Sequence, residues 1–136
     1  MVTAWWDVVS LRSPLGRVIG LGSAKSGSEH WYSQRVSAVA VTVLSVWFIV
    51  ALASLGSLAF GDITHWLSRP LNAALCALLL IACAQHAWLG LQVVIEDYVG
   101  GKFARLVLLV AMKFIFILAA AAGVLAVLRV ATGPVA

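Results

Sequence analysis

Long apolar runs alternate with short polar stretches along this chain, and the run lengths predict its elements. Residues 36–57 and 71–95 contain no charged side chain, and residues 106–128 contain only Lys113. An α-helix rises about 1.5 Å per residue, so each run is long enough to cross a hydrocarbon core of about 30 Å. Lipid cannot satisfy backbone polar groups, so such a run must be helical. The pattern predicts three transmembrane helices.

The polar stretches between the runs are short. "FGDITHWLSRP" joins the first two runs, and "EDYVGGKFAR" joins the second and third. Pro70 suits the first turn of a helix, where its missing N–H breaks no bond. Gly100 and Gly101 stop helices and can adopt a left-handed cap conformation. Because loops this short force neighbouring helices to run antiparallel, we expect an all-α membrane protein whose three-helix part spans residues 35–130.

Composition supports the membrane class. The chain is 63% hydrophobic and 10% charged, with 6 Trp, whereas a soluble domain has about 25% charged residues. Tryptophan is typical of lipid–water interfaces. Cys76 and Cys83 lie within one apolar run without a CxxC motif, which indicates packing residues rather than a disulfide or zinc site.

The positive charge indicates topology rather than nucleic-acid binding. The formal net charge is +4, and the charges lie mostly outside the apolar runs. Lysine and arginine favour the cytoplasmic side. Outside the apolar runs, six lie before the first run or in the second loop, and two lie in the first loop or the C-terminal tail. The six are Arg12, Arg17, Lys25, Arg35, Lys102 and Arg105, and the two are Arg69 and Arg129. We therefore expect a cytoplasmic N-terminal segment, 1–34, and a periplasmic tail, 131–136.

The N-terminal segment leaves two interpretations open. It lacks a continuous apolar core followed by a cleavage site, so we expect no cleaved secretory signal, which favours a bacterial inner membrane. "LGSAKSGS" is typical of a loop. The apolar side chains before it can lie on the membrane surface or dock onto a soluble partner; they are Trp5, Trp6, Val8, Val9 and Leu11.

His86 is the first candidate for chemistry, because it lies near the middle of an apolar run, 12 residues before Tyr98. Ionisable groups inside a membrane are functional hypotheses by default, although an interhelical hydrogen bond is an alternative. Gly90 would let a flat macrocycle approach the backbone, and Leu79 and Val93 extend the same apolar face. The residues alone leave haem ligation, proton transfer and interhelical packing open.

A haem at His86 would take its second ligand from another chain. His30 precedes the first run and His65 lies in the opposite loop, so neither shares the depth of His86. One histidine supplies one axial bond. A six-coordinate haem therefore predicts a partner chain.

Glu96-Asp97-Tyr98 ends the second run with acids where topology requires none. A tyrosine hydroxyl at the membrane boundary can hydrogen-bond a carbonyl, and a nearby acid can move protons. The alternative is an interfacial tyrosine beside solvated acids. Arg35, on the same expected side, is either a topology anchor or a cation near a quinone or a haem propionate. Lys113 is expected to snorkel toward the head groups.

"HAWLGLQVVIEDYV" resembles the second-helix signature H-x-W-x-G-x-x-x-V-x-x-D-Y-V of the hydrophobic membrane anchor subunit of succinate dehydrogenase, the smaller of its two anchors. "SPLGRVIGLGSAKSGSEHWYSQRVSAVA" is similar to the N-terminal part of that subunit in alphaproteobacteria. The likeness covers roughly residues 12–130. Gly100 stands where many relatives carry a histidine.

The resemblance implies specific roles. The chain would not be an enzyme on its own, but would complete succinate:ubiquinone oxidoreductase (complex II), which joins the tricarboxylic acid cycle to respiratory electron transfer. His86 would ligate the iron of haem b, Tyr98 would hydrogen-bond ubiquinone, and Asp97 and Arg35 would lie close to the quinone.

The resemblance also implies partners. They are a cytochrome b556 anchor subunit, which supplies the second haem ligand, and an iron–sulfur subunit and a flavoprotein that carry the iron–sulfur clusters and FAD. One alternative is a fumarate reductase anchor that uses menaquinone. A second is a small membrane protein without redox function, in which His86 only packs helices.

Overall fold

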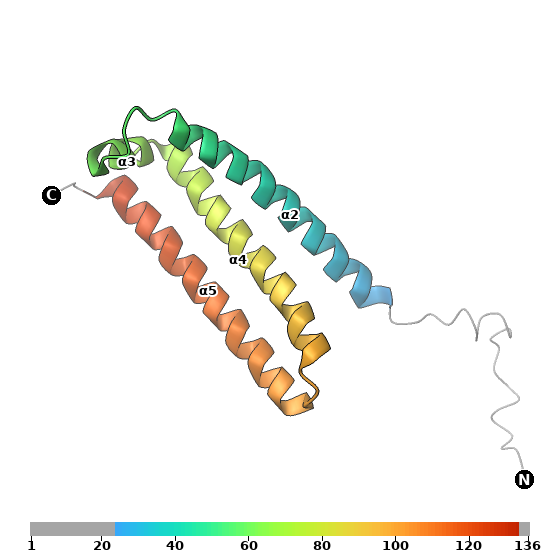
Figure 1. Cartoon of the computed structure of the whole chain (residues 1–136). Coiled ribbons are helices and arrows are strands. Elements are labelled where there is room, and N and C mark those ends of the chain that lie inside the picture. The colour runs from blue at the N-terminus through green and yellow to red at the C-terminus, as the bar shows by residue number, and fades with distance from the viewer. Residues whose placement is uncertain (1–23, 134–136) are drawn as a thin grey trace, which may run out of the picture. The chain divides into compact units, whose positions relative to one another are not determined.

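A computed structural model describes residues 24–133 of the chain, with side chains from Ser28 onward, and every element in that part is helical. The helices are α2 (Ala24–Ala53), α3 (Phe60–Leu67), α4 (Pro70–Tyr98) and α5 (Lys102–Thr132) (Figure 1). The residues proposed to lie on the membrane surface or on a partner, 5–11, fall outside the described residues.

Contacts divide the chain into two units, Met1–Trp31 and Tyr32–Ala136. The described part of the first unit is the start of α2, which continues into the second unit. All packing described below lies within the second unit.

Three of the helices are long and apolar enough to cross a membrane, which confirms the predicted three spans. They cover Ser28–Ala53, Pro70–Tyr98 and Lys102–Thr132, with 26, 29 and 31 residues. The first helix begins earlier than predicted, because "AKSGS" is helical rather than a loop, and it ends at Ala53 rather than at residue 57. Pro70 occupies the first turn of α4, as predicted.

Helix α3 is a feature that the sequence did not predict, since its residues were assigned to a connection. It lies at the end of the bundle where α2 ends and α4 begins (Figure 1). Trp66 is 9% exposed and stacks on Trp47 of α2 with ring centroids 5.9 Å apart. The Asn72 side-chain amide donates to the Trp66 carbonyl at 2.8 Å. An eight-residue helix depends on such tertiary contacts, because isolated helices this short are marginal in water.

The turn between α4 and α5 corrects the expected role of its glycines. Gly101 precedes α5 with φ −79° and ψ 117°, and Val99 ends α4 with φ −96° and ψ 100°. Neither Gly100 nor Gly101 has a φ in the left-handed range. The turn is therefore made by extended backbone, and the Arg105 N–H then donates to the Gly101 carbonyl to begin α5.

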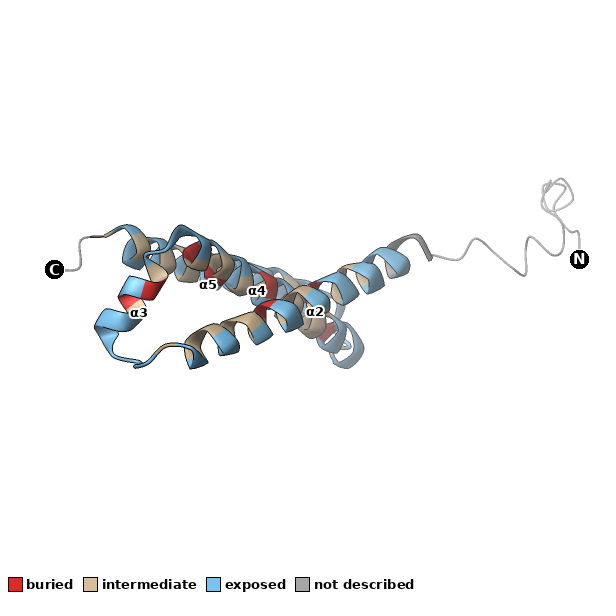
Figure 2. Ribbon diagram, turned by 90° about the horizontal axis from the view of Figure 1, so that it is seen from above, coloured by how far each residue is buried: buried red, intermediate tan, exposed pale blue. Residues whose placement is uncertain are grey.

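The core is thin and is centred on α4. Its buried residues include the small side chains Ala73, Cys76 and Ala82, together with Leu89 and Ile95. Small residues let helices approach closely in a membrane. Helix α5 has no buried residue. Figure 2 shows that most of the helical ribbon is exposed or intermediate. Much of the apolar surface is thus left for lipid or for another chain.

Candidate functional site

His86 lies on the side of α4 from which its ring reaches α2. Its Nδ1 is 3.1 Å from the Ser37 hydroxyl oxygen, across 49 positions of sequence. The same hydroxyl donates to the Gln34 carbonyl at 3.0 Å. Ser37 is only 8% exposed and the imidazole is half-buried. An interhelical hydrogen bond is therefore present, but it engages one ring nitrogen and leaves Nε2 as the nitrogen that can bind a metal.

On this chain, the surface of α4 beside His86 is open enough to accept a flat group. A Cβ added at Gly90 would meet no atom within 4 Å. Gly90 follows His86 by one turn, so both lie on one side of α4. Among the described residues, no three His, Cys, Asp or Glu side chains gather as a metal site. The donor set thus fits one axial bond to a haem, and does not fit a metal ion held by this chain alone.

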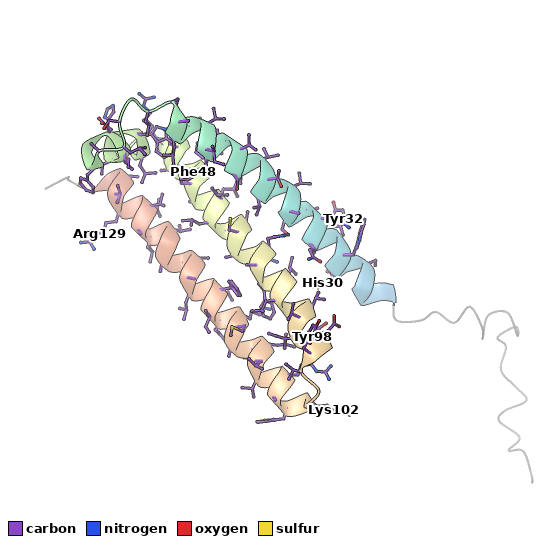
Figure 3. The ribbon with its side chains drawn as sticks, in the orientation of Figure 1. His30, Tyr32, Phe48, Tyr98, Lys102 and Arg129 are labelled. Atoms are coloured by element: carbon purple, nitrogen blue, oxygen red, sulfur yellow. The ribbon has the colours of Figure 1, made fainter. Side chains whose placement is uncertain are left out.

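Tyr98 has very different surroundings. It is the last residue of α4 and is 84% exposed. Asp97 is also exposed, while Glu96 accepts a hydrogen bond from the Gln92 amide at 2.8 Å. Figure 3 shows Tyr98 and Lys102 at the α4–α5 turn, at the opposite end of the helices from Phe48. Tyr98 can therefore donate to a group outside this chain, but this chain does not enclose it.

Arg35 lies closer to the level of His86 than to that of Tyr98. The Ser37–His86 contact sets the levels of the antiparallel helices α2 and α4. Arg35 precedes Ser37 by two residues, about 3 Å of helical rise, whereas Tyr98 follows His86 by 12 residues, about 18 Å. About 15 Å along the helices therefore separates the backbones of Arg35 and Tyr98. Along the helix axes, the backbone of Arg35 therefore lies nearer to the level of His86 than to that of Tyr98.

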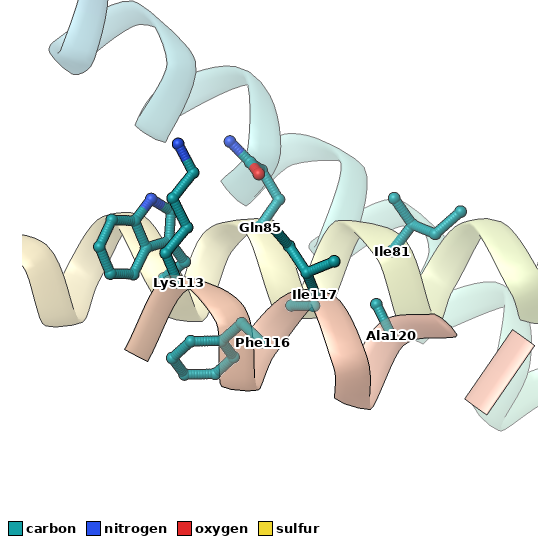
Figure 4. Close-up of a pocket in the computed structure, with 8 residues that line it drawn as sticks. Ile81, Gln85, Lys113, Phe116, Ile117 and Ala120 are labelled. Carbon is teal, nitrogen blue, oxygen red and sulfur yellow. The ribbon is translucent and has the colours of Figure 1, made fainter. Parts of the chain in front are cut away.

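A groove lies between α4 and α5 that was not predicted from the sequence. Its volume is about 310 Å³, and α4 and α5 each supply four of its lining residues: Ile81, Ala84, Gln85 and Trp88, then Lys113, Phe116, Ile117 and Ala120. Figure 4 shows Lys113 and Gln85 extending toward the same side of the groove. Both sets follow the helical spacing i, i+3, i+4, i+7 of one helix face, but apolar side chains all around both helices hid this face in the sequence.

A second hollow lies at the far end of the bundle, by α3. Its volume is about 480 Å³ and its lining is mixed polar and apolar, including Asp62, His65, Arg69 and Asn72. His65 thus lies at the opposite end of α4 from Tyr98. It is not placed to share a ligand with His86, in agreement with the sequence reasoning.

Comparison with known proteins identifies relatives over most of the chain. Residues 10–127 match the family model of the succinate dehydrogenase/fumarate reductase transmembrane subunit. The succinate dehydrogenase hydrophobic membrane anchor subunit of Rickettsia bellii is 35% identical over 116 residues, which cover 85% of this chain and 93% of the relative.

Two further anchor subunits are similar over comparable lengths. The subunit of Rickettsia conorii is 32% identical over 120 residues, 88% of this chain and 95% of its own length. The subunit of Paracoccus denitrificans is 33% identical over 116 residues, 85% of this chain and 89% of its own length. Together with three helices able to span a membrane, these matches show that the chain is a multi-pass membrane protein and belongs to the succinate dehydrogenase/fumarate reductase transmembrane subunit family.

Proposed function

We propose that this chain is the smaller membrane anchor of a bacterial succinate dehydrogenase, in which it helps to hold a haem b and to form the site of ubiquinone reduction. The observation that carries the haem assignment is the hydrogen bond and the surroundings of the His86 imidazole. Its Nδ1 contacts the Ser37 hydroxyl, and Gly90, one turn further along α4, leaves that side of the helix without a side chain. Membership of the family supports the rest of the assignment.

In this proposal His86 supplies one axial nitrogen to the haem iron, and a histidine of a second anchor chain supplies the other. When bound, the haem provides a one-electron redox centre within the membrane. His86 holds its position because α2 contributes a hydrogen bond to the ring. The level of Arg35, about 3 Å from that of Ser37 along the helix, favours a contact with haem propionates over one with the quinone.

Tyr98 is proposed to donate a hydrogen bond from its hydroxyl to a carbonyl oxygen of ubiquinone. Its exposure leaves the hydroxyl accessible to a ligand held between chains. Asp97, the preceding residue, is proposed to orient Tyr98 or to deliver protons to the reduced quinone. The proposed partners are a cytochrome b556 anchor, an iron–sulfur subunit and a flavoprotein, assembled on the cytoplasmic side of the inner membrane, where the N-terminus is also placed by its positive charge.

Purification of the tagged chain from native membranes in mild detergent tests this assignment. We expect the three partner chains to co-purify and reduced-minus-oxidised spectra to show a b-type haem band. We also expect the preparation to reduce ubiquinone with succinate. A chain that purifies without a flavoprotein, an iron–sulfur protein and haem would overturn the proposal.

A fumarate reductase anchor is the second candidate, because the matching family model covers both enzymes. The two assignments differ in the quinone and in the direction of turnover. Extraction of the quinone that co-purifies, with rates of succinate oxidation and fumarate reduction, separates them. Menaquinone together with faster fumarate reduction would favour the second candidate.

A further inference from the structure

We propose that Ser37 is a positioning residue for His86, which it holds in the tautomer that presents Nε2 to the haem iron. The inference rests on the proposed function, because it concerns the histidine assigned there as axial ligand. It adds Ser37 of α2 to the residues that the sequence indicated around His86. Two hydrogen bonds carry it, one from Ser37 to the Gln34 carbonyl and one between Ser37 and His86.

The protons of these two bonds assign the tautomer. A serine hydroxyl has one proton to donate and two lone pairs to accept with. Ser37 donates that proton to the Gln34 carbonyl at 3.0 Å. We infer that, with this proton directed at the Gln34 carbonyl, Nδ1–H donates to the Ser37 oxygen in the 3.1 Å contact with His86. In a neutral imidazole with hydrogen on Nδ1, Nε2 carries the lone pair, which is the form that binds a metal.

Burial makes this arrangement specific to Ser37. With Ser37 only 8% exposed, water is not at hand to replace its oxygen as the acceptor for Nδ1–H. An unsatisfied polar group in such surroundings costs about 1–3 kcal/mol. The ring is then held at two points, its bond to the α4 backbone and its hydrogen bond to α2. Both its rotation and its tautomer are set before iron binds.

Such a partner has a chemical effect on the ligand as well as a geometric one. A hydrogen bond from the second ring nitrogen makes the metal-binding nitrogen more basic. A more basic ligand favours the ferric over the ferrous state. Loss of the Ser37 oxygen should therefore weaken haem retention and raise the midpoint potential of the haem. A bond that only packs α2 against α4 would change neither property once the complex has assembled.

The test compares Ser37→Thr with Ser37→Val in the complete purified complex. Threonine and valine have nearly the same shape, but only threonine keeps a hydroxyl, which in a helix also bonds a carbonyl one turn back. Ser45→Ala is the control, since Ser45 is a half-buried serine further along the same helix. Haem per flavin is measured after a challenge with free imidazole, and the haem midpoint potential is measured by redox titration.

We expect Ser37→Thr and Ser45→Ala to match the unmodified complex. Ser37→Val should lose haem about 10–100-fold more readily, the usual effect of removing such a partner, and its midpoint potential should shift upward. Equal haem retention and equal potentials in the threonine and valine variants would overturn the role of Ser37. Absence of haem from the unmodified complex would instead overturn the proposed function itself.

Discussion

The two candidate sites on α4, at His86 and at Tyr98, differ in burial and in the contacts that this chain provides. His86 is half-buried and one of its ring nitrogens is held by a buried serine of α2. Tyr98, 12 residues later, is 84% exposed. The difference teaches that one helix can carry one candidate residue held by a neighbouring helix and another that the described part of the chain leaves open.

The largest effect is expected at His86. His86→Ala should abolish stable haem binding, because it removes the axial nitrogen and no other histidine of the described residues lies at that depth. Absorbance of the reduced haem per flavin in the purified complex measures the loss. Gln85→Ala is the matched control, since Gln85 lies on the same turn but lines the α4–α5 groove. Haem content equal to that of the control would disprove His86 as ligand.

The second-largest effect is expected at the exposed residue Tyr98. Tyr98→Phe removes one hydroxyl, and the loss of a hydrogen bond of about 1.5 kcal/mol lowers a rate about tenfold. We expect ubiquinone reduction to fall by at least about that factor, while succinate oxidation with an artificial acceptor stays unchanged. Haem content should also stay unchanged, since about 18 Å of helix separates Tyr98 from His86. Full quinone turnover in this variant would remove Tyr98 from the quinone site.

A substitution of Arg35 tests whether this residue acts at the proposed haem site or at the proposed quinone site. The Arg35 backbone lies about 15 Å along the helices from that of Tyr98 but only about 3 Å from the level of Ser37. Arg35→Gln should therefore lower the haem midpoint potential, since a nearby cation favours the reduced haem. The KM for ubiquinone should change less than about threefold. A larger change in KM with an unaltered potential would assign Arg35 to the quinone instead.

The smallest effect is expected at Lys113. It lines the groove between α4 and α5, whereas His86 contacts α2. Lys113→Gln should change haem retention and quinone turnover by less than about twofold, since α4 separates the groove from the α2 side. Both assays on the purified complex check this expectation. A loss of haem in this variant would show that the two faces of α4 act on one site.

The sequence by itself determined the three spans and the spacing of His86 and Tyr98. Both depend on length and hydropathy, which are local properties, and lipid permits only a helix for such a run. It missed α3, whose tryptophan is held by Trp47 of another helix. A left-handed cap was among the conformations open to the glycines of the α4–α5 turn, but extended backbone joins the helices there.

Only the tertiary structure decided that Ser37 meets His86 and that Arg35 shares their level. In soluble helices an apolar stripe reveals the buried face. Here apolar side chains surround each helix, since lipid accepts them on every side, and the pattern does not say which face meets which neighbour. The contact of α2 with α4 at Ser37 and His86 is seen only in the folded chain. The residue that orients the candidate ligand therefore lies 49 positions away from it.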